Sequence, residues 1–552
     1  MKIAVARTLI ALLAFAAVWF SNLEYRKLVN PDEGRYAEIP REMVASGDWI
    51  TPRLNDIKYF EKPALQYWAT AAAYTVFGEH QWTARLWSAL TGLLGVLMVF
   101  FTGRRLFGAQ AGLYAALVLG SSLLWVLIGH VNTLDMGVSF FLSAAVCAFL
   151  LAQHDAAEAR ARTPWMLAAW AALALALLSK GLIGLVLPAA ALVLYMLIER
   201  DWRLAGRLRL FAGVALLLAL TLPWFVAVSR ANPESFHFFF IHEHFERFLT
   251  RQHERYEAPY YFVSVLLAGM LPWTLILIDA LARAWKRDPQ QRFQVRRFLF
   301  LWAAVVFVFF SASSSKLLPY ILPMFPALAL LIGARLTQLG ARALAWQTLP
   351  AALAGIALLA LLPGIGRYAS RDDSVELLLL YDYADWLYVA ALLQIAGAVG
   401  CAWLAWRGKT QAALVVLAGA GLAFAQLALS GHESLSTTKS AYHIAQKIKP
   451  ELKPGMPFYS VDTYDQSLQF YLRRSTTMVA YKDELGFGIA QEPEKFIPTL
   501  AQFETTWNAE REALALIPPR AYEAFRAKGL PMRLVARDTR RIVVARHLAA
   551  NP

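Results

Sequence analysis

A charged stretch, NPDEGRY at residues 30–36, separates the first apolar segment of the chain from the second. It places the acidic pair Asp32-Glu33 and the cation Arg35 close to a segment long enough to cross a bilayer. Charged groups beside a bilayer are costly to desolvate, so they usually mark a functional site. The surrounding apolar segments therefore predict a membrane protein whose chemistry lies in its connecting loops.

The composition excludes an ordinary soluble protein of this length. Of the 552 residues, 58% are hydrophobic and only 17% are charged, whereas soluble domains carry about 25% charged residues. The 18 Trp and 21 Tyr suit the aromatic belts of membrane interfaces. The net charge of +14 is dispersed over many connections and forms no basic stripe, so we expect no nucleic acid to bind.

Two further features narrow the class of protein. Cys147 and Cys401 both lie within apolar segments, which excludes a disulfide framework and a CxxC metal site. Residues 3–20 have the character of a signal peptide, but the following SNLE at 21–24 is no small-x-small cleavage site. We therefore expect an uncleaved first helix.

Thirteen apolar segments approach the roughly 20 residues that a membrane-spanning helix needs. They centre near 4–22, 82–102, 109–129, 133–152, 164–179, 181–198, 209–228, 260–282, 297–311, 317–338, 345–365, 384–406 and 411–430. Residues 64–77 are apolar but short, which favours a helix lying in the interface. The sequence predicts a polytopic α-helical domain over residues 1–430, with about thirteen transmembrane helices and an interfacial helix in the first outer loop.

Lys and Arg residues concentrate in alternate connections. Examples are Arg104-Arg105, the segment 200–209, the segment 283–297 and Arg407 with Lys409. The positive-inside rule places these connections and the N-terminus in the cytoplasm. The outer face then receives residues 23–81 and everything after 431.

Residues 431–552 differ in composition from the rest of the chain. Helix-like and strand-like segments alternate, as in QSLQFYLRR at 466–474 followed by TTMVAY at 476–481. This alternation predicts a small α/β domain. No Gly-rich phosphate loop follows any of the strands, so nucleotide binding is unsupported.

Several outer segments carry residues suited to a phosphate-bearing, lipid-linked substrate. Fixed cations stabilise the charge that develops on a departing polyprenyl phosphate, and Lys62 and Arg247 suit this role, with Lys316 and Tyr320 as further donors. A carboxylate is needed to orient the acceptor or to balance a developing positive sugar. Asp32 is the first candidate and Asp135 the second.

Each candidate also has a purely structural interpretation. Asp32-Glu33 and Asp135 stand where acids cap helix N-termini, and Lys62 has the length to snorkel from the interface. His242 and His244 lack the HExxH spacing and suit solvated loop histidines, with metal binding as the alternative. Lys180 suits an interfacial anchor, with a role in ligand binding as the alternative. The gathering of all these residues on one predicted face favours the functional interpretation.

The motifs resemble those of C-type membrane glycosyltransferases, in the protein O-mannosyltransferase-like group. The fuller pattern is similar to the bacterial lipid A 4-amino-4-deoxy-L-arabinose transferases. It comprises Asn30-Pro31-Asp32-Glu33-x-Arg35-Tyr36, Tyr59-Phe60-Glu61-Lys62-Pro63, Asp135, Glu243-His244-x-x-Arg247-Phe248, Pro259-Tyr260-Tyr261-Phe262 and Ser315-Lys316-Leu317-x-Pro319-Tyr320-x-Leu322-Pro323.

The resemblance implies a C-type glycosyltransferase fold and a reaction. Aminoarabinose would move from undecaprenyl phosphate to a lipid A phosphate at the periplasmic face of the bacterial inner membrane, which masks negative charge and confers resistance to polymyxin and other cationic peptides. The C-terminal domain would be periplasmic, and membrane lipids would surround a monomer. No cofactor would be required, and a divalent metal, if bound, would not be essential.

The resemblance also assigns roles to residues. Those beside the reacting centre would be Asp32, Asp135 and Glu33. Those at the donor phosphate would be Lys62, Arg247, Tyr59, His242, Tyr320 and Lys316. Supporting residues would be Arg35, Glu61, Glu243 and His244. Because a lipid A phosphate is already anionic at neutral pH, we expect Asp32 and Asp135 to orient groups and tune charge more than to abstract a proton.

The sequence is also compatible with three other functions, to different degrees. A relative with another sugar or a protein acceptor, such as a mannosyltransferase, makes similar demands on donor-phosphate binding. A lipid or sugar transporter would place polar residues at mid-bilayer on broken helices in paired repeats, and the chain shows no repeated halves. A membrane scaffold would not require acids and cations on several separate outer loops.

Overall fold

The computed structural model describes residues 13–239, 257–369 and 374–547. Within these ranges nine helices are long and apolar enough to cross a membrane, and two bent helix pairs bring the number to eleven. The chain is therefore a multi-pass membrane protein. The uninterrupted long helices are α4 (Gln81–Phe107), α7 (Leu134–Gln153), α8 (Ala159–Lys180), α10 (Leu210–Ala231), α15 (Val295–Ala312), α19 (Ser374–Trp406) and α20 (Thr410–Gly431).

The other apolar segments are built from shorter helical pieces. They are α5 (Ala109–Ser121), α6 (Leu123–Gly129), α9 (Ile183–Glu199), η1 (Trp202–Arg207), α11 (Glu234–His237), α13 (Tyr261–Gly269), α14 (Thr274–Ala284), η3 (Leu318–Met324), α16 (Phe325–Leu336), α17 (Ala341–Gln347), α18 (Leu349–Leu361) and η4 (Leu362–Tyr368). The α5–α6 pair is bent by 63° and the α13–α14 pair by 111°. Pro272 lies at the second bend, where its missing N–H interrupts the helical hydrogen bonds.

The predicted count of thirteen spans stays a prediction. The segment 4–22 lies partly outside the described residues, and α9 is shorter than the helices that qualify as spans. The polytopic helical architecture itself is confirmed. What hydropathy did not reveal is that the predicted spans 109–129 and 260–282 are bent, because a bend leaves the total apolar length unchanged.

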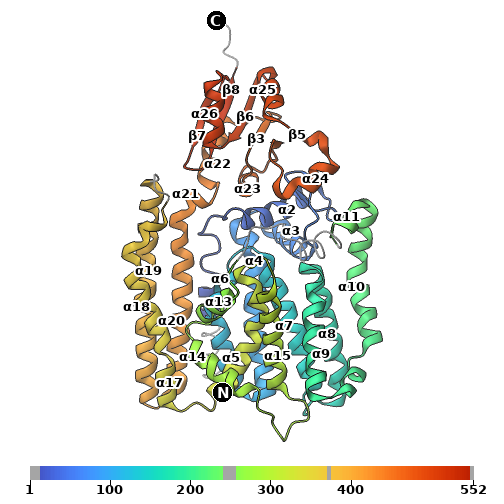
Figure 1. Ribbon diagram of the computed structural model, residues 1–552, viewed down its shortest axis with the longest axis vertical. Coiled ribbons are helices and arrows are strands. Elements are labelled where there is room, and N and C mark those ends of the chain that lie inside the picture. Colours follow the sequence, from blue (N-terminus) through green and yellow to red (C-terminus); the bar gives the residue numbers. More distant parts are fainter. Residues whose placement is uncertain (1–12, 240–256, 370–373, 548–552) are drawn as a thin grey trace.

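The first outer loop folds into short elements at one end of the helical bundle (Figure 1). They are α2 (Asp32–Ser46), the hairpin β1 (Arg53–Leu54) and β2 (Ile57–Lys58), and α3 (Leu65–Phe77), which corresponds to the helix predicted over 64–77. α2 begins with two acids, Asp32 and Glu33, as helix N-termini favour. The connections that follow α9, α14 and α19 lie at the opposite end of the bundle.

A six-stranded sheet with helices follows α20, as the alternating pattern predicted. Its strand order is β5-β4-β3-β6-β8-β7, parallel from β5 to β6 and antiparallel from β6 to β7. The strands are β3 (Phe458–Val461), β4 (Thr477–Val479), β5 (Phe496–Ile497), β6 (Glu512–Ile517), β7 (Arg533–Arg537) and β8 (Ile542–His547).

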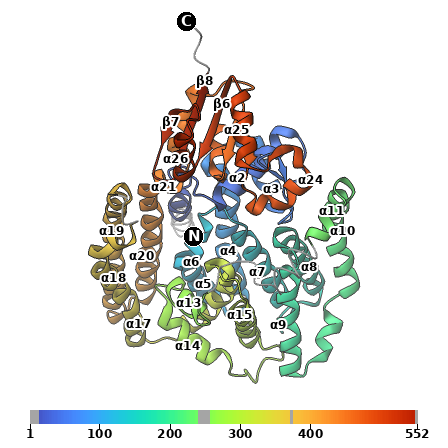
Figure 2. The same ribbon diagram turned by 45° about the horizontal axis from the view of Figure 1, so that its top comes forward.

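Short helical elements join these strands and connect the sheet to the bundle. They are η5 (His432–Leu435), α21 (Ser436–Lys439), α22 (Tyr442–Ile448), η6 (Lys449–Glu451), α23 (Gln466–Leu472), η7 (Asp483–Leu485), α24 (Gly486–Gln491), η8 (Pro493–Lys495), α25 (Leu500–Ala509) and α26 (Pro519–Ala527). α23 lies against α2 (Figure 1), and α24 lies beside α3 in both views (Figures 1 and 2). The C-terminal domain therefore covers the first outer loop.

Candidate functional site

The acidic pair at the start of α2 divides into one exposed and one buried carboxylate. The side chain of Asp32 is 52% exposed, whereas that of Glu33 is 1% exposed. The two residues are neighbours in sequence, but a helix turns each side chain about 100° from the last. Asp32 is thus accessible to a substrate, and Glu33 is held within the protein.

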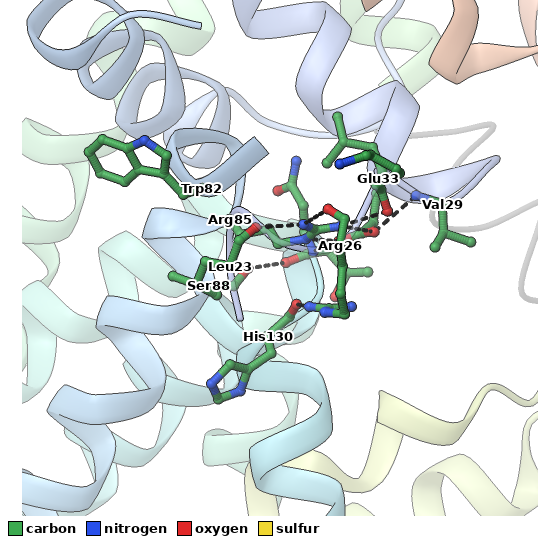
Figure 3. Close-up of polar contacts among 12 residues, drawn as sticks. Leu23, Arg26, Val29, Glu33, Trp82, Arg85, Ser88 and His130 are labelled. Carbon is green, nitrogen blue, oxygen red and sulfur yellow. Dashed lines mark hydrogen bonds and ion pairs between the residues drawn. The ribbon is translucent and has the colours of Figure 1, made fainter. Parts of the chain in front are cut away.

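Glu33 is saturated with hydrogen bonds (Figure 3). Its two carboxylate oxygens accept from Nε and Nη2 of Arg85 on α4, each at 2.7 Å. They also accept from the backbone N–H groups of Val29 and Asn132, each at 3.0 Å. Burial alone raises the pKa of Glu33, but the charge and hydrogen bonds of Arg85 outweigh burial and lower that pKa to about 2. Glu33 is therefore ionised and committed to contacts within the protein.

Arg85 organises the loop that leads into α2. Its guanidinium donates to the carbonyl oxygens of Leu23 and Arg26 at 2.7 and 2.6 Å, and to that of Lys27 at 3.0 Å. Arg26 in turn donates to the carbonyl of His130, just before α7. The Glu33–Arg85 pair thereby connects the loop before α2 with the loop before α7.

The second connection runs through Asn132, three residues before Asp135. Besides donating its N–H to Glu33, Asn132 accepts a hydrogen bond at 3.0 Å from Gln66 of α3. Gln66 follows the Glu61-Lys62 segment by four residues. A buried network centred on Glu33 thus fixes the segments that carry Asp32, Asp135 and Lys62.

A pocket of about 410 Å³ opens among α7, α9, α15, η3 and the first outer loop. Charged and polar side chains line part of it, and apolar side chains from the membrane helices line the rest. The polar and charged residues are Glu61, Lys62, Asp135, Ser139, Lys180, Ser313, Ser314, Ser315 and Tyr320. Such a pocket suits an amphipathic ligand with a charged head and an apolar tail.

Asp135 and Lys180 form an ion pair within this pocket. The Nζ atom of Lys180 also lies 4.9 Å from the centre of the Tyr320 ring, within the range of a cation–π contact. The sequence favours an interfacial anchor for Lys180, with ligand binding as the alternative, and the structure places Lys180 as the last residue of α8. The fold places it among the first-choice residues instead, because α8 ends beside the start of α7.

Asp32 does not line the pocket but lies in the same cluster of charges. The buried Tyr36 hydroxyl shows this: burial raises its pKa, Arg35 lowers it, and the carboxylates of Asp32, Glu61 and Asp135 raise it further. Tyr36 therefore lies within electrostatic reach of all three carboxylates. The ring of Tyr36 also stacks on Tyr67 with a centroid distance of 6.2 Å.

The remaining predicted donors have different environments. Lys62 donates to the carbonyl of Glu61 at 2.8 Å and lies 3.9 Å from its carboxylate. Tyr59 is buried, and its hydroxyl has no hydrogen-bond partner among the described residues. Lys316 donates to the carbonyls of Ser313 at 2.9 Å and Glu257 at 3.4 Å. Lys316 thus supports the loop that lines the pocket and does not line it itself.

Four predicted residues, His242, Glu243, His244 and Arg247, lie outside the described residues. In the ranges that the structure describes, no three His, Cys, Asp or Glu side chains gather as a metal site would require. The expectation that no cofactor is required stays a prediction.

Sequence patterns gave no signal for Arg85 or Glu484. Arg85 lies near the start of an apolar helix, and the sequence around it does not indicate that its partner is Glu33. Glu484 belongs to the C-terminal domain, yet its carboxylate lies 2.5 Å from Arg35 beside Asp32. Only the fold brings segments so distant in the chain together.

Comparisons with known proteins agree with this fold and identify the family. Residues 444–546 match the aminoarabinose transferase C-terminal domain, and residues 5–239 match the dolichyl-phosphate-mannose-protein mannosyltransferase family. The fold is similar to crystal structures of ArnT from Cupriavidus metallidurans, in the apo state and bound to undecaprenyl phosphate. The TM-scores are 0.91 and 0.93, with 39% identity and 98% of both chains covered in each case.

Curated relatives carry the name undecaprenyl phosphate-alpha-4-amino-4-deoxy-L-arabinose arabinosyl transferase. The Erwinia tasmaniensis protein is 33% identical over 70% of this chain and 71% of its own length. The Aeromonas salmonicida protein is 34% identical over 68% and 70%. The alignment with the Enterobacter relative spans 60% of each chain at 32% identity. The chain therefore belongs to the family of undecaprenyl phosphate-aminoarabinose arabinosyl transferases.

Proposed function

We propose that the chain transfers 4-amino-4-deoxy-L-arabinose from undecaprenyl phosphate to a phosphate of lipid A, at the periplasmic face of the inner membrane. The observation that carries this proposal is the pocket that combines Lys62, Lys180, Asp135 and Tyr320 with an apolar wall. A polyprenyl phosphate has the same division into a charged head and an apolar chain. Family membership supports the same donor.

In the proposed reaction a lipid A phosphate oxygen attacks the anomeric carbon of the sugar. The bond from that carbon to the donor phosphate oxygen breaks, and undecaprenyl phosphate leaves with the electron pair. Cations near the departing phosphate stabilise its charge in the transition state. Lys62 and Lys180 line the pocket and suit this task, and Arg247 and His242 are the further donors expected from the sequence.

The carboxylates have separate tasks in this proposal. Asp135 holds Lys180 through their ion pair and faces the pocket. Asp32, the exposed member of the pair at α2, orients the amino sugar or the acceptor. Glu33 has both oxygens engaged by Arg85 and backbone N–H groups, so it positions the loops and does not meet the substrate.

Mass spectrometry of lipid A tests the transfer. The chain is expressed in cells that lack their own aminoarabinose transferase but still make the donor. We expect an aminoarabinose adduct with the intact chain and loss of most of it with Asp32→Asn. Asp56→Asn is the matched control, because Asp56 lies in the same outer loop and is similarly exposed, at 58%, but its carboxylate pairs with Lys495, whereas that of Asp32 pairs with Arg35.

The outcomes separate the alternatives. Absence of an adduct from the intact chain, with donor supply proven, would contradict this sugar or this acceptor. An adduct retained by Asp32→Asn would support the transferase activity but contradict a role of Asp32 in transfer, and Asp32 would then only stabilise the start of α2. Polymyxin survival of the same cells tests the proposed resistance, which we expect to follow the amount of adduct.

A further inference from the structure

The C-terminal domain contacts the first outer loop through buried polar groups. The side chain of Asn55 donates to the carbonyl of Thr476 and accepts from its N–H, both at 2.7 Å. The N–H of Leu28 donates to the hydroxyl of Tyr471 at 2.7 Å. Paired, buried hydrogen bonds of this kind fix one orientation of the two parts.

A series of polar contacts runs from Asp32 through Arg35 and Glu484 to Gln466 and Asn30. Arg35 donates from Nη1 to Asp32 at 2.8 Å, and its Nη2 lies 2.5 Å from the carboxylate of Glu484. Glu484 accepts a second hydrogen bond at 2.6 Å from the side chain of Gln466. The N–H of Gln466 donates to Asn30 at 3.0 Å. Asn30 precedes Asp32 in the chain and Arg35 follows it. The C-terminal domain therefore contacts the chain on both sides of Asp32.

Gly34 shows how closely the two parts approach. A Cβ atom at Gly34 would lie 2.5 Å from the backbone nitrogen of Ser467 and 2.6 Å from the carbonyl carbon of Gln466. Both are backbone atoms of the start of α23, which no side-chain rotation can displace. The glycine is therefore needed for α23 to pack against the first turn of α2, where Asp32 lies.

We propose that Glu484 is a positioning residue for the transfer, which holds the Arg35 guanidinium and thereby the orientation of Asp32. The expected effect of Glu484 on transfer rests on the proposed function. Its effect on the positions of Arg35 and Asp32 rests on the hydrogen-bond geometry alone. The side chains of Arg35 and Glu484 are 13% and 10% exposed, so water screens their attraction only weakly. Asp32 is more than half exposed and has no comparable means of keeping one orientation.

Charge explains why a carboxylate is required at position 484. A guanidinium bound at both ends between two carboxylates has a fixed plane and a fixed direction. Without the charge of Glu484, Arg35 has Asp32 as its one carboxylate partner among these residues, and the exposed Asp32 side chain does not fix the guanidinium by itself. The geometry at Asp32 then loosens, and a misplacement of about 1 Å costs catalysis of the order of 100-fold.

Steady-state kinetics with the full-length protein in lipid nanodiscs test the proposal. We expect Glu484→Gln to lower kcat by ~10-fold to 100-fold with little change in the KM for the donor, since the binding pocket is unchanged. Glu484→Asp, which keeps the charge, should recover part of kcat. Glu504→Gln is the matched control: Glu504 forms an ion pair with Lys528 in the same domain, away from α2, and should retain wild-type kinetics.

Hydrogen exchange separates this proposal from the proposed function. We expect Glu484→Gln to increase amide exchange in residues 30–36 relative to both the wild type and Glu504→Gln. If the wild type does not transfer aminoarabinose, the proposed function fails, and exchange alone decides whether Glu484 positions this segment. Unchanged exchange would overturn the proposal, as would kinetics of Glu484→Gln equal to those of Glu504→Gln.

Discussion

Glu33 and Asp32 illustrate how burial divides the tasks of adjacent, chemically similar side chains. Glu33 meets Arg85 where neither group has access to solvent, and Asp32 stands at the surface of the same helix turn. A buried ion pair contributes little net stability, but removing one partner leaves an unpaired buried charge, which costs about 3–5 kcal/mol. The two residues should therefore respond very differently to loss of their charge.

We expect Glu33→Gln to lower the free energy of unfolding by about 3 kcal/mol at neutral pH, and Asp32→Asn to change it by less than about 0.5 kcal/mol. Because the pKa of Glu33 falls from 4.5 to about 2 on folding, its stabilisation is fully present above pH 4.5 and is lost as the pH falls towards 2. Thermal unfolding in detergent at several pH values measures this. Equal melting temperatures for both variants at pH 7 would contradict the positioning role of Glu33.

Lys180 and Asp135 should act as one unit. We expect Asp135→Asn and Lys180→Gln each to lower kcat/KM, and the double variant to lose less than the product of the two losses. The coupling free energy for side chains in contact is about 0.5–3 kcal/mol. Asp135→Asn combined with Lys453→Gln is the control, because Lys453 pairs with Glu512 at the distant sheet. The free-energy effects of these two substitutions on kcat/KM should be additive. Additivity in the first cycle would show that the ion pair has no part in transfer.

The charge state of the acceptor limits what a carboxylate needs to do. A phosphate oxygen is anionic before it attacks, so we expect kcat to show no essential base with a carboxylate-like pKa of about 4. Asp32→Asn should then lower kcat by the same factor at every pH from about 3 to about 8, a range that includes the pKa of a carboxylate. A wild-type rate that falls with such a pKa, together with a flat profile for Asp32→Asn, would instead assign proton abstraction to Asp32.

Local sequence identified candidate groups better than it identified their partners. Glu61, Lys62, Asp135 and Tyr320 were selected from their motifs, and the fold brings all four to one pocket. Glu33 carried the same motif signal as Asp32, because a pattern of residue types does not reveal which side of a short helix faces inward. Glu484 carried no signal, since its partner Arg35 lies about 450 positions earlier in the chain.

Helices and strands of the outer region depend on contacts with the C-terminal domain. α24 packs on β2, immediately before the Tyr59-Phe60-Glu61-Lys62 segment. Glu492 accepts hydrogen bonds from Arg53 at 2.9 Å and from the N–H of Lys58 at 3.0 Å. The ring of Phe487 lies 6.3 Å from that of Phe60. The hairpin thus has its position set by a helix from the far end of the chain.

A single methyl group at Gly488 should disturb this packing. Its Cβ would lie 2.2 Å from the carbonyl oxygen of Lys58, so α24 or β2 must move. We expect Gly488→Ala to cost about 1–3 kcal/mol of stability and to lower transfer through displacement of the Lys62 segment. Thermal unfolding and the lipid A adduct measure the two effects.

Gly486→Ala in the same helix provides the control. Its Cβ would meet only the side chain of Lys482, at 3.8 Å, and Gly486 has an ordinary helical φ of −55°. We expect wild-type activity and a stability that is unchanged or raised by up to about 1 kcal/mol. Equal behaviour of the two variants would show that the α24–β2 contact does not control the site.

Sequence patterns predict helices and strands well where the burial of apolar side chains alone determines the element. Apolar length identified the long helices, and the alternating pattern after residue 431 indicated the α/β fold. The bends at α5–α6 and α13–α14 and the mixed strand order of the sheet were not foreseen. Both depend on packing between elements, which the pattern within one element does not contain.

The molecule as a whole is polarised along the axis of its helices. The C-terminal sheet, α2 and α3 lie at one end, and the connections after α9, α14 and α19 lie at the other (Figure 1). The second group carries the clustered arginines and lysines that the positive-inside rule assigns to the cytoplasm. Transfer to an outer acceptor requires the pocket and the C-terminal domain to share the periplasmic side.

Labelling of single introduced cysteines tests this orientation. The native Cys147 and Cys401 are buried, which gives a low background. Gln290 lies exposed in the connection between α14 and α15, and Glu523 lies exposed on α26 of the C-terminal domain. In intact spheroplasts we expect a membrane-impermeant maleimide to label Glu523→Cys and not Gln290→Cys, and permeabilised membranes to label both. Labelling of Gln290→Cys in sealed cells would invert the topology and place the pocket on the side of the membrane where a periplasmic acceptor is absent.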